Sequence, residues 1–584
     1  MFKFKTNAMA ALVLGLGLLT ACSSNDELGN GTDTAPNGST YMSVAINLST
    51  GSGTRADADN QKDTEESDKP DYNFVGKWAG KDKIKAIEVY VFDASNKLEA
   101  NEEFAAGQFQ VQGAAADNSV TIAPSKGIKV LPGNKTVYVV VNPTQETKDF
   151  LPHDKGTTTL DAFKVKYENV ADAAGNFLAP ANTGNAHTNV KTSADGLAAV
   201  DGDNTDVITM TAIEAATNVD VKDNVSEKAT LAGNTTNRAN LTVKRAVARV
   251  MVTTTATEFI VKGDDALTQG VVEPDAELGK VTKIKYVVGQ GEKSIYFMQR
   301  QGGIPELTYK TPNSDYKTNK DYTWTNVGPK YDYSGLWKGY DDTGAENING
   351  ITVPTKTLYN SVAGTALENI KNDLVAQLNG EFILPNTHKW GDTQDASDYR
   401  KGNTAYVLVR AQFQPKRVVK EDGTIYEDYS YPAGKDFYLG ANGIFYESIT
   451  AAHDAAKKGV AKQDASLYVK GKTLYYAWIN PDKTGAVEGN KWINSPVNRN
   501  NIYHIEISGF KRIGTNWNPL VPSDDPEPNP NDPNNPDPKP DNPNEPDEPS
   551  VDPDDPLTPK ETWMSVETKI LPWNVHSYSV ELDM

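Results

Sequence analysis

Few residues of this chain have the spacing that a catalytic or metal-binding group requires. The six histidines are dispersed, and they lie at positions 153, 187, 388, 453, 504 and 576. No His-Glu-x-x-His sequence, phosphate-binding loop or Gly-x-Ser-x-Gly sequence is present. A single cysteine, Cys22, excludes both a multi-thiolate metal site and an intramolecular disulfide. We therefore expect no catalysis, no bound metal and no cofactor.

One acidic loop has oxygen ligands at alternating positions, as a calcium site does. It runs Asp201-Gly-Asp203-Asn-Thr-Asp206. A helix-loop-helix calcium site requires glycine at its sixth position and glutamate at its twelfth, where this chain has Asp206 and Ala212. We expect a solvated loop here and keep calcium binding as the less favoured alternative.

The densest aromatic cluster could bind a sugar by stacking. It consists of Tyr331, Tyr333, Trp337 and Tyr340. Tyrosine and tryptophan are equally suited to covering the end of a β-sandwich or to lining a subunit contact, and we favour that structural role. The rival function is a surface lipoprotein that binds glycans or nutrients as a monomer.

Cys22 is a candidate site of lipid attachment. Lys3 and Lys5 precede an apolar run from Ala8 to Leu19, which is too short to span a bilayer alone. The run ends in Leu19-Thr20-Ala21-Cys22, the order typical of a bacterial lipoprotein signal, in which the thiol is acylated. We expect an exported lipoprotein; the alternative is an ordinary secretory signal that ends near a cysteine.

The peptide bond after Arg55 is a candidate processing site. Arg55 lies in Gly51-Ser-Gly-Thr-Arg-Ala-Asp57, a flexible and polar stretch of the kind in which proteolysis concentrates. We expect a trypsin-like protease to cut between Arg55 and Ala56.

Two strand-like segments on either side of the main body have nearly the same pattern. Tyr41-Met-Ser-Val-Ala-Ile-Asn-Leu48 and Trp563-Met-Ser-Val-Glu-Thr-Lys-Ile570 share an aromatic residue, Met, Ser and Val in the same order. Both present alternate apolar residues to one face. The alternative, that two unrelated strands share this pattern by chance, stays open.

These segments suggest that one strand replaces the other. Cleavage at Arg55 would release strand 42–48 and leave a groove that a neighbour's C-terminal strand could fill. Such a contact is head to tail and does not close, so it generates a filament. The residues of the displaced strand that would face the core are Met42, Val44, Ile46 and Leu48, and those of the donor segment are Trp563, Met564, Val566, Thr568, Ile570, Trp573, Tyr578, Val580 and Leu582.

A proline-rich stretch precedes the donor segment. Residues 522–559 hold 14 Pro among 38 residues, with 12 acidic residues and a single Lys539. This composition predicts a semi-rigid, extended spacer, which at about 3.1 Å per residue could reach on the order of 100 Å.

The body of the chain has the pattern of an antiparallel β-sandwich. The predicted strands are 84–92, 136–142, 241–253, 283–288, 294–298, 404–412, 436–439, 473–479 and 501–508. Helical periodicity is clear only from Ala366 to Leu378, and a weaker helix fits Ser448 to Lys458. Residues 165–235 have few large apolar side chains, so we expect long surface loops there and a domain boundary near 240.

Charge argues against nucleic acid as a partner. The 584 residues include 58 basic and 78 acidic ones, which gives a net charge of -20. Binding to a phosphate backbone needs clustered Lys and Arg.

Several motifs together resemble one protein family. They are Val243-Lys-Arg-Ala-Val-Ala-Arg249, Tyr331-Asp-Tyr-Ser-Gly-Leu-Trp337, Lys401-Gly-Asn-Thr-Ala-Tyr-Val-Leu-Val409, Arg499-Asn-Asn-Ile-Tyr-His-Ile505, and Met564-Ser-Val with Leu571-Pro-Trp573 and Val575-His-Ser-Tyr578. The chain resembles the fimbrillin family of the Bacteroidales, and within it the minor fimbrial shaft pilins of the Porphyromonas type, which are subunits of type V pili. The resemblance is weaker over residues 145–235 and 310–330.

The resemblance implies a mainly β fold with two transthyretin-like sandwich domains and a few short helices. We expect a lipoprotein signal at 1–21, a lipidated propeptide at 22–55, β-domains at 56–240 and 241–520, a linker at 521–560 and donor strands at 561–584. It also implies export to the outer membrane, cleavage by an Arg-specific protease and strand exchange between identical subunits in a surface fimbria that supports adhesion and biofilm formation. Tip and anchor fimbrial proteins and host or bacterial receptors are the further partners it implies, and a tip or anchor subunit is a further alternative for this chain.

Overall fold

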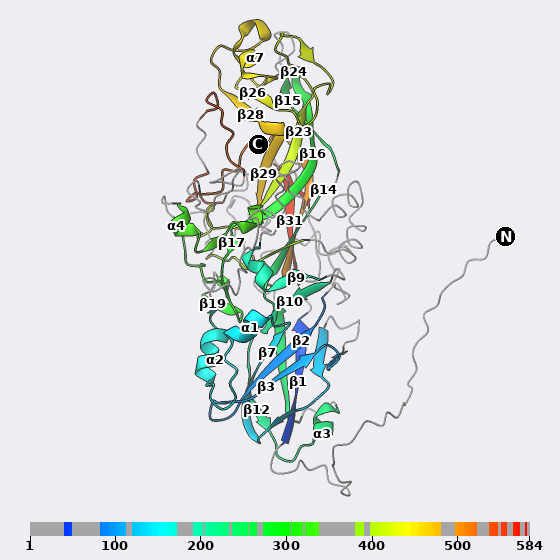
Figure 1. The fold of residues 1–584 in the computed structure, drawn as a ribbon, viewed down its shortest axis with the longest axis vertical. Helices are drawn as coiled ribbons and strands as arrows, with labels where there is room; N and C mark the ends of the chain where they lie inside the picture. Colours follow the sequence, from blue (N-terminus) through cyan, green and yellow to red (C-terminus); the bar gives the residue numbers. More distant parts are fainter. Residues whose placement is uncertain are drawn as a thin grey trace, which may run out of the picture.

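The computed structural model describes most of the main body of the chain. The described residues are 40–49, 82–112, 119–171, 191–201, 205–232, 236–254, 256–265, 273–304, 307–318, 322–337, 380–389, 397–479, 497–522, 537–546, 551–557, 564–572 and 579–580. They form two β-rich lobes stacked along the long axis of the molecule (Figure 1). Within these residues no helix combines the length and apolar character needed to cross a membrane. The mainly β fold predicted from the sequence is confirmed.

The first lobe is built on a ten-stranded sheet in the order β3-β2-β7-β11-β13-β1-β5-β4, with β12 also on β7 and β6 also on β1. Its strands are β1 (Thr40–Ser49), β2 (Ala86–Phe92), β3 (Leu98–Ala105), β4 (Phe109–Gln112), β5 (Ser119–Pro124), β6 (Ile128–Val130), β7 (Gly133–Val141), β11 (Met210–Ala212), β12 (Ala216–Val221) and β13 (Arg238–Arg245). Branched and aromatic side chains on β2 and β7, such as Val89 and Val139, are fully buried.

Short helices cover parts of this lobe. They are α1 (Gln145–Phe150), α2 (Leu160–Tyr167) and α3 (Glu227–Leu231), and the hydroxyls of Thr144, Thr159 and Ser226 cap their N-termini. Phe163 and Tyr167 of α2 stack at 5.3 Å between ring centroids and are fully buried.

The prediction of long surface loops over residues 165–235 is wrong for the described part of that range. β11 lies inside the main sheet, and Leu197, Ile208 and Met210 are buried in the first core. The remaining elements of this region are β8 (Val170–Ala171), β9 (Ala198–Val200), β10 (Asp206–Ile208) and the turn η5 (Ser193–Gly196). The prediction failed because small residues such as Ala198, Thr211 and Ala212 are themselves buried here, so the segment joins the core with few large side chains.

The single strand predicted at 241–253 is in fact two strands in different sheets. β13 belongs to the first lobe, whereas β14 (Ala248–Thr254) belongs to the second. Ala246 and Val247 are fully buried between them, so the hydrophobic pattern continues while the chain passes from one sheet to the other. Ala246 and Val247 belong to the first core, and Ala248 and Val250 belong to the second, although Met251 of β14 still packs in the first.

The second lobe packs two sheets over a second core. One has the order β22-β14-β30-β31, with β32 also on β30, and the other has the order β15-β16-β23-β29. Their strands are β15 (Phe259–Asp265), β16 (Glu273–Gly289), β22 (Glu381–Ile383), β23 (Tyr406–Pro415), β29 (Lys472–Trp478), β30 (Asn501–Phe510), β31 (Met564–Pro572) and β32 (Ser579–Val580).

A smaller sheet lies at the far end of the second lobe, in the order β25-β24-β27-β26-β28. Its strands are β24 (Val418–Val419), β25 (Ile425–Tyr426), β26 (Phe437–Gly440), β27 (Phe445–Tyr446) and β28 (Ala465–Tyr468). The other elements are β17 (Gly291–Glu292), β18 (Ile295–Tyr296), β19 (Arg300–Ile304), β20 (Leu307–Lys310), β21 (Tyr331–Asp332), α4 (Trp324–Val327), η6 (Ser334–Trp337) and η8 (Val469–Gly471).

The two predicted helices of this half have different outcomes. The weaker one is shorter than predicted: α7 (Ile449–His453) ends at Asp454, and the turn η7 (Ala455–Lys457) follows before Lys458 adopts a positive φ of 62°. The helix predicted over 366–378 lies outside the described residues.

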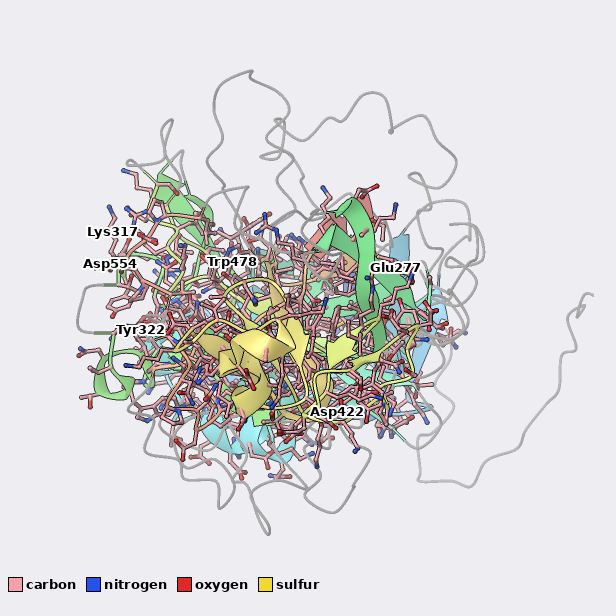
Figure 2. The ribbon with its side chains drawn as sticks, turned by 90° about the horizontal axis from the view of Figure 1, so that it is seen from above. Glu277, Lys317, Tyr322, Asp422, Trp478 and Asp554 are labelled. Atoms are coloured by element: carbon pink, nitrogen blue, oxygen red, sulfur yellow. The ribbon has the colours of Figure 1, made fainter. Side chains whose placement is uncertain are left out.

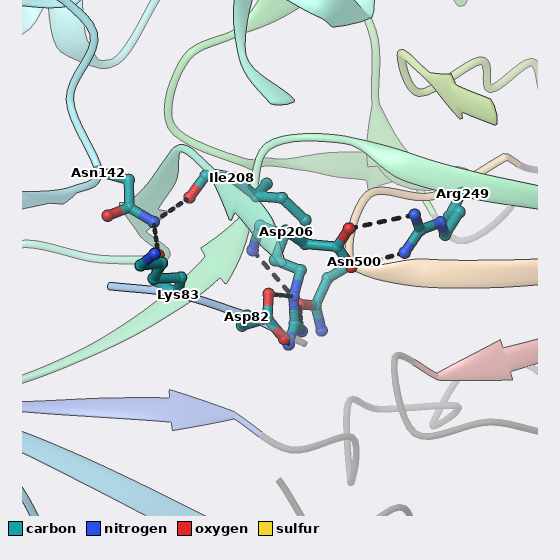
Figure 3. Close-up of polar contacts among 8 residues, drawn as sticks. Asp82, Lys83, Asn142, Asp206, Ile208, Arg249 and Asn500 are labelled. Atoms are coloured by element: carbon teal, nitrogen blue, oxygen red, sulfur yellow. Dashed lines mark hydrogen bonds and ion pairs between the residues drawn. The ribbon is translucent and has the colours of Figure 1, made fainter. Parts of the chain in front are cut away.

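A buried ion pair and buried hydrogen bonds join the two lobes (Figure 3). The Arg249 guanidinium on β14 donates to Asp206, with an Nη1–Oδ2 distance of 2.6 Å, and both side chains are almost completely buried. Arg245 on β13 pairs with Asp82 at 2.5 Å and also bonds to Asn500. Residues from both lobes thus share one buried polar network, which ties the sheets together.

The proline-rich segment is not the free, extended spacer that its composition predicted. Asp537 is fully buried, and its carboxylate accepts from Arg410 Nε at 2.6 Å and pairs with Lys472 at 3.2 Å. Leu557 is buried in the second core, and Thr318 donates to Asp554 at 2.7 Å. Seen from above, Asp554 lies on the same side of the second lobe as Lys317 and Tyr322 (Figure 2). The described parts, 537–546 and 551–557, are therefore fastened to the second lobe.

Candidate strand-exchange site

β1 occupies an interior position in the first sheet. It pairs in parallel with β13, from Ser43 opposite Arg238 to Leu48 opposite Val243. Along its other edge it pairs antiparallel with β5 and, near its start, with β6. A strand with hydrogen-bonding partners on both edges leaves two rows of unpaired backbone groups when it departs.

The core-facing side chains of β1 are the four that the alternation predicts. Met42, Val44, Ile46 and Leu48 have exposed fractions of 0%, 1%, 0% and 4%. Each such buried side chain contributes roughly 1.5 to 3 kcal/mol of gross hydrophobic stabilisation, before ordering costs. The apolar walls around this strand include Ile122 of β5, Ile128 of β6, and Leu241 and Val243 of β13. The slot held by β1 is thus a long apolar groove with hydrogen-bonding edges.

A polar anchor closes the start of the groove, and sequence reasoning missed it. Thr40 is fully buried, and its hydroxyl donates to the Lys222 carbonyl at 2.8 Å while it accepts from the Val225 N–H at 3.1 Å. The Asn237 amide donates to the same hydroxyl at 3.2 Å and to the Tyr41 carbonyl at 3.0 Å. Only Thr40 on β1 supplies a hydroxyl to this cluster.

Helix α3 supports this anchor from outside. It packs on β1, and Glu227 in its first turn accepts a hydrogen bond from the Gly127 N–H at 2.9 Å. A Cβ at Gly127 would lie 3.3 Å from the ring of Tyr41 and 3.0 Å from Glu227, so glycine permits this close approach. Contacts from α3 and from Gly127 thus hold the start of the groove.

The C-terminal donor segment is docked on its own second lobe. β31 runs antiparallel to β30, from Asn501 opposite Pro572 to Phe510 opposite Met564, and the pairing is irregular between Ile505 and Gly509. β31 lies at the end of its sheet, with β30 as its ladder partner. β32 then pairs in parallel with Glu506 and Ile507. Within the described part of the chain, β31 therefore has one partner edge, whereas β1 has two.

Part of the donor segment forms two strands. Met564, Val566, Thr568 and Ile570 lie on β31 and Val580 lies on β32. Trp563, Trp573, Tyr578 and Leu582 lie outside the described residues, as do Cys22, Arg55 and Ala56.

Among the residues that the structure describes, which exclude Tyr340 and positions 202–204, the other sequence-predicted groups do not gather into a site. Tyr331 and Tyr333 are buried in the second core, and Tyr333 donates to Gln290 at 3.1 Å, so neither offers a surface for glycan stacking. In the acidic loop, Asp206 pairs with Arg249, and Asp201 pairs with Lys83 at 3.0 Å. The solvated loop expected there is wrong for Asp206, because that carboxylate is buried. Among the described residues no group of three acidic, histidine or cysteine side chains is placed to hold a metal ion.

Comparisons with known proteins converge on fimbrial subunits. The C-terminal fimbrillin family of type IV major fimbrial subunit proteins matches residues 466–579. Two curated sequences from Porphyromonas gingivalis, both named minor fimbrium subunit Mfa1, are 31% identical to this chain over 584 residues, which covers 99% of this chain and 100% of each relative.

Solved structures with similar strand arrangements align only loosely. A candidate cell adhesion protein from Parabacteroides distasonis has a TM-score of 0.34 at 11% identity, covering 91% of this chain and 99% of that one. The fimbrial anchor protein Mfa2 from Porphyromonas gingivalis has a TM-score of 0.19 at 14% identity, covering 50% of this chain and 70% of that one.

Proposed function

We propose, from the premise that this chain belongs to the fimbrillin family and is a structural, non-enzymatic fimbrial subunit, that it polymerises into the shaft of a surface fimbria by donor-strand exchange. In this mechanism β1 leaves the first lobe, and the C-terminal strand of the next subunit takes its place. The observation that carries the proposal is the pairing of β1 on both edges and its burial in the first core.

The difference between the two docking positions supports the direction of exchange. β31 pairs along one edge, with an interrupted register, whereas the β1 groove offers β13 on one side and β5 and β6 on the other. A strand that moves from the first position to the second gains a second ladder of backbone hydrogen bonds, each worth roughly 0.5 to 1.5 kcal/mol net. Backbone hydrogen bonding therefore favours exchange once the groove is empty.

Proteolysis at Arg55 is the proposed trigger. While the chain is intact, β1 is tethered to the body through residues 50–81, so it competes for the groove at a high effective concentration. Cleavage between Arg55 and Ala56 turns β1 into a separate peptide that can diffuse away. The sequence supports this assignment because Arg55 is the only arginine before Arg238.

Transport and partners follow from the same proposal. Cys22 carries the lipid that brings the precursor to the outer membrane, and an Arg-specific protease then removes the lipidated segment 22–55. Identical subunits join head to tail, and accessory tip and anchor proteins terminate the filament. Adhesion to host or bacterial receptors is the proposed role of the assembled fimbria.

Limited digestion of the purified precursor with an Arg-specific protease tests this function. We expect cleavage at Arg55 to produce a ladder of high-mass species in mild SDS and filaments in electron micrographs. The matched control is Arg55→Gln, which keeps the fold and should stay monomeric under the same digestion. Clean cleavage at Arg55 without any polymer would refute the trigger.

A further inference from the structure

We propose that the neighbour's donor strand enters the groove in the same direction and register as β1, with Thr562 in the place of Thr40 and Glu567 in the place of Ala45. This inference rests on the proposed function and deepens it, because it assigns two positioning residues and the polarity of the exchanged strand. The occupant is residues 562–570 of a second copy of this chain.

The first argument is the buried anchor at the start of the groove. When β1 leaves, the Val225 N–H and the Asn237 amide lose the hydroxyl of Thr40 as their acceptor, and the Lys222 carbonyl loses its donor. Asn237 is only 2% exposed while a strand fills the groove, so a replacement strand would again shut water out and leave these groups without partners unless it supplied its own. A replacement strand therefore needs a small hydroxyl residue at this register position.

The donor segment has such a residue at the matching position. Thr562-Trp-Met-Ser-Val566 aligns with Thr40-Tyr-Met-Ser-Val44, so the match extends one residue before the aromatic pair. With Thr562 at the anchor, Met564 and Val566 fall at the places of Met42 and Val44, which face the core. A strand in the opposite direction would carry Thr562 to the far end of the groove, away from Asn237.

The second argument is a cationic side chain beside the groove, one nitrogen of which is buried without a hydrogen-bond partner. Ser43 is opposite Arg238 and Ala45 is opposite Asn240 on the parallel neighbour β13. Side chains of alternate residues share one face, so the position of Ala45 lies diagonally next to Arg238. The Nε of Arg238 is buried and has no hydrogen-bond partner within the described chain.

The proposed register brings a carboxylate to this guanidinium. Glu567 aligns with Ala45, so the incoming strand places an acceptor next to Arg238, which β1 cannot do. The new pair would be a charge-assisted hydrogen bond at a half-buried site. At this position the neighbour's strand would bind the groove better than β1 does. At the next position it would bind less well, because Thr568 would take the place of the fully buried Ile46.

A disulfide scan tests the direction of the strand. Asn47 is opposite Thr242 in the β1 register, and Lys569 aligns with Asn47. The only native cysteine, Cys22, precedes Arg55 and is removed by processing, so the mature chain has no background thiol. After digestion and oxidation, Thr242→Cys with Lys569→Cys should give a covalent ladder on non-reducing gels. The matched pair Thr242→Cys with Ser565→Cys should cross-link only if the strand runs in the opposite direction.

Side-chain replacements test the two positioning residues. Thr562→Val and Glu567→Gln should each raise the dissociation constant between subunits by about tenfold, so the polymer should come apart at lower urea concentrations. Thr562→Ser keeps the hydroxyl and should leave the dissociation constant as in the wild type. The charge exchange Arg238→Glu with Glu567→Arg should recover the loss seen in Arg238→Glu alone. Thermal melts of the uncut monomers confirm that each variant folds.

The outcomes separate this inference from the proposed function. If the unaltered mature chain forms no polymer, donor-strand exchange itself is refuted. If it polymerises but cross-links through Ser565→Cys, the direction proposed here is wrong. If the Lys569→Cys ladder forms but Thr562→Val and Glu567→Gln are silent, the two residues do not position the strand.

Discussion

At the scale of single residues, burial sets the protonation of two polar groups in the second lobe. His388 is 1% exposed, and its Nε2 lies 2.9 Å from the Asn403 carbonyl. Burial lowers the pKa of His388 to about 4, so the ring is neutral in the folded protein. Burial likewise raises the pKa of Glu292 to about 8, although Asn313 donates to its carboxyl at 3.0 Å. Both groups make stability depend on pH.

For His388 we predict a loss of stability on acidification. The folded-state pKa of about 4 lies below the ordinary value of 6.5, so the unfolded chain binds the proton more readily. Stability is fully present above pH 6.5 and falls as pH drops towards 4, by on the order of 3 kcal/mol. Urea unfolding of His388→Gln, which keeps an Nε2 donor for Asn403, should show a shallower loss than the wild type over this range. His153→Gln, at an exposed position, is the control; equal slopes in all three proteins would refute the assignment.

At the scale of elements, the positions of the two terminal strands and the linker bear on the proposed strand exchange. β1 is held in the first lobe, β31 is held on β30, and the linker segments 537–546 and 551–557 are fastened to the second lobe. Between Leu557, which is buried, and Met564 at the start of β31 there are only seven residue steps, or at most about 25 Å of extended chain. The donor strand can therefore reach far only if the linker detaches.

For the linker we predict that Asp537 is the residue on which its attachment depends. Asp537→Asn leaves the buried Arg410 guanidinium without its charged partner, which typically costs about 3 to 5 kcal/mol. We expect hydrogen exchange over residues 537–557 to become faster in this variant than in the wild type. Asp541→Asn makes the same chemical change at an exposed position of the same segment and should leave exchange unchanged. Protection of 537–557 in the Asp537→Asn protein would contradict the prediction.

At the scale of the whole molecule, the lobes are coupled through buried polar contacts. Arg499 donates from the second lobe to the Arg245 carbonyl at 2.8 Å and to Thr211 at 2.9 Å. Burial lowers the pKa of Arg499 to about 10, which still leaves the guanidinium charged at neutral pH. Phe382 and Leu384, which follow β14 by more than a hundred residues, belong to the first core. The two lobes therefore share both buried hydrogen bonds and apolar packing.

For this junction we predict a strong effect of Asp206→Asn. The change removes the charged partner of the fully buried Arg249 and should lower the free energy of unfolding by about 3 to 5 kcal/mol. Asp275→Asn alters an exposed ion pair with Lys262 and should cost less than about 1 kcal/mol. Urea denaturation followed by tryptophan fluorescence compares the two. Similar costs for both variants would mean that the buried pair does not couple the lobes.

The sequence by itself determined the strand-rich fold, the shared pattern of segments 41–48 and 563–570, and the family. Alternating side chains predicted that Met42, Val44, Ile46 and Leu48 face a core, because the two-residue period of a strand is visible in the chain. Only the tertiary structure decided that Thr40 anchors the groove, that Arg238 lies beside it, and that Asp206 and Asp537 are buried rather than solvated. Burial of a polar residue depends on a partner that is distant in sequence, here Asn237, Arg249 or Arg410. The residues next to it in the chain do not show which partner it will meet. The linker shows the same limit: its proline and acidic composition favours an extended chain, but contacts with Arg410 and Lys472 hold it in place.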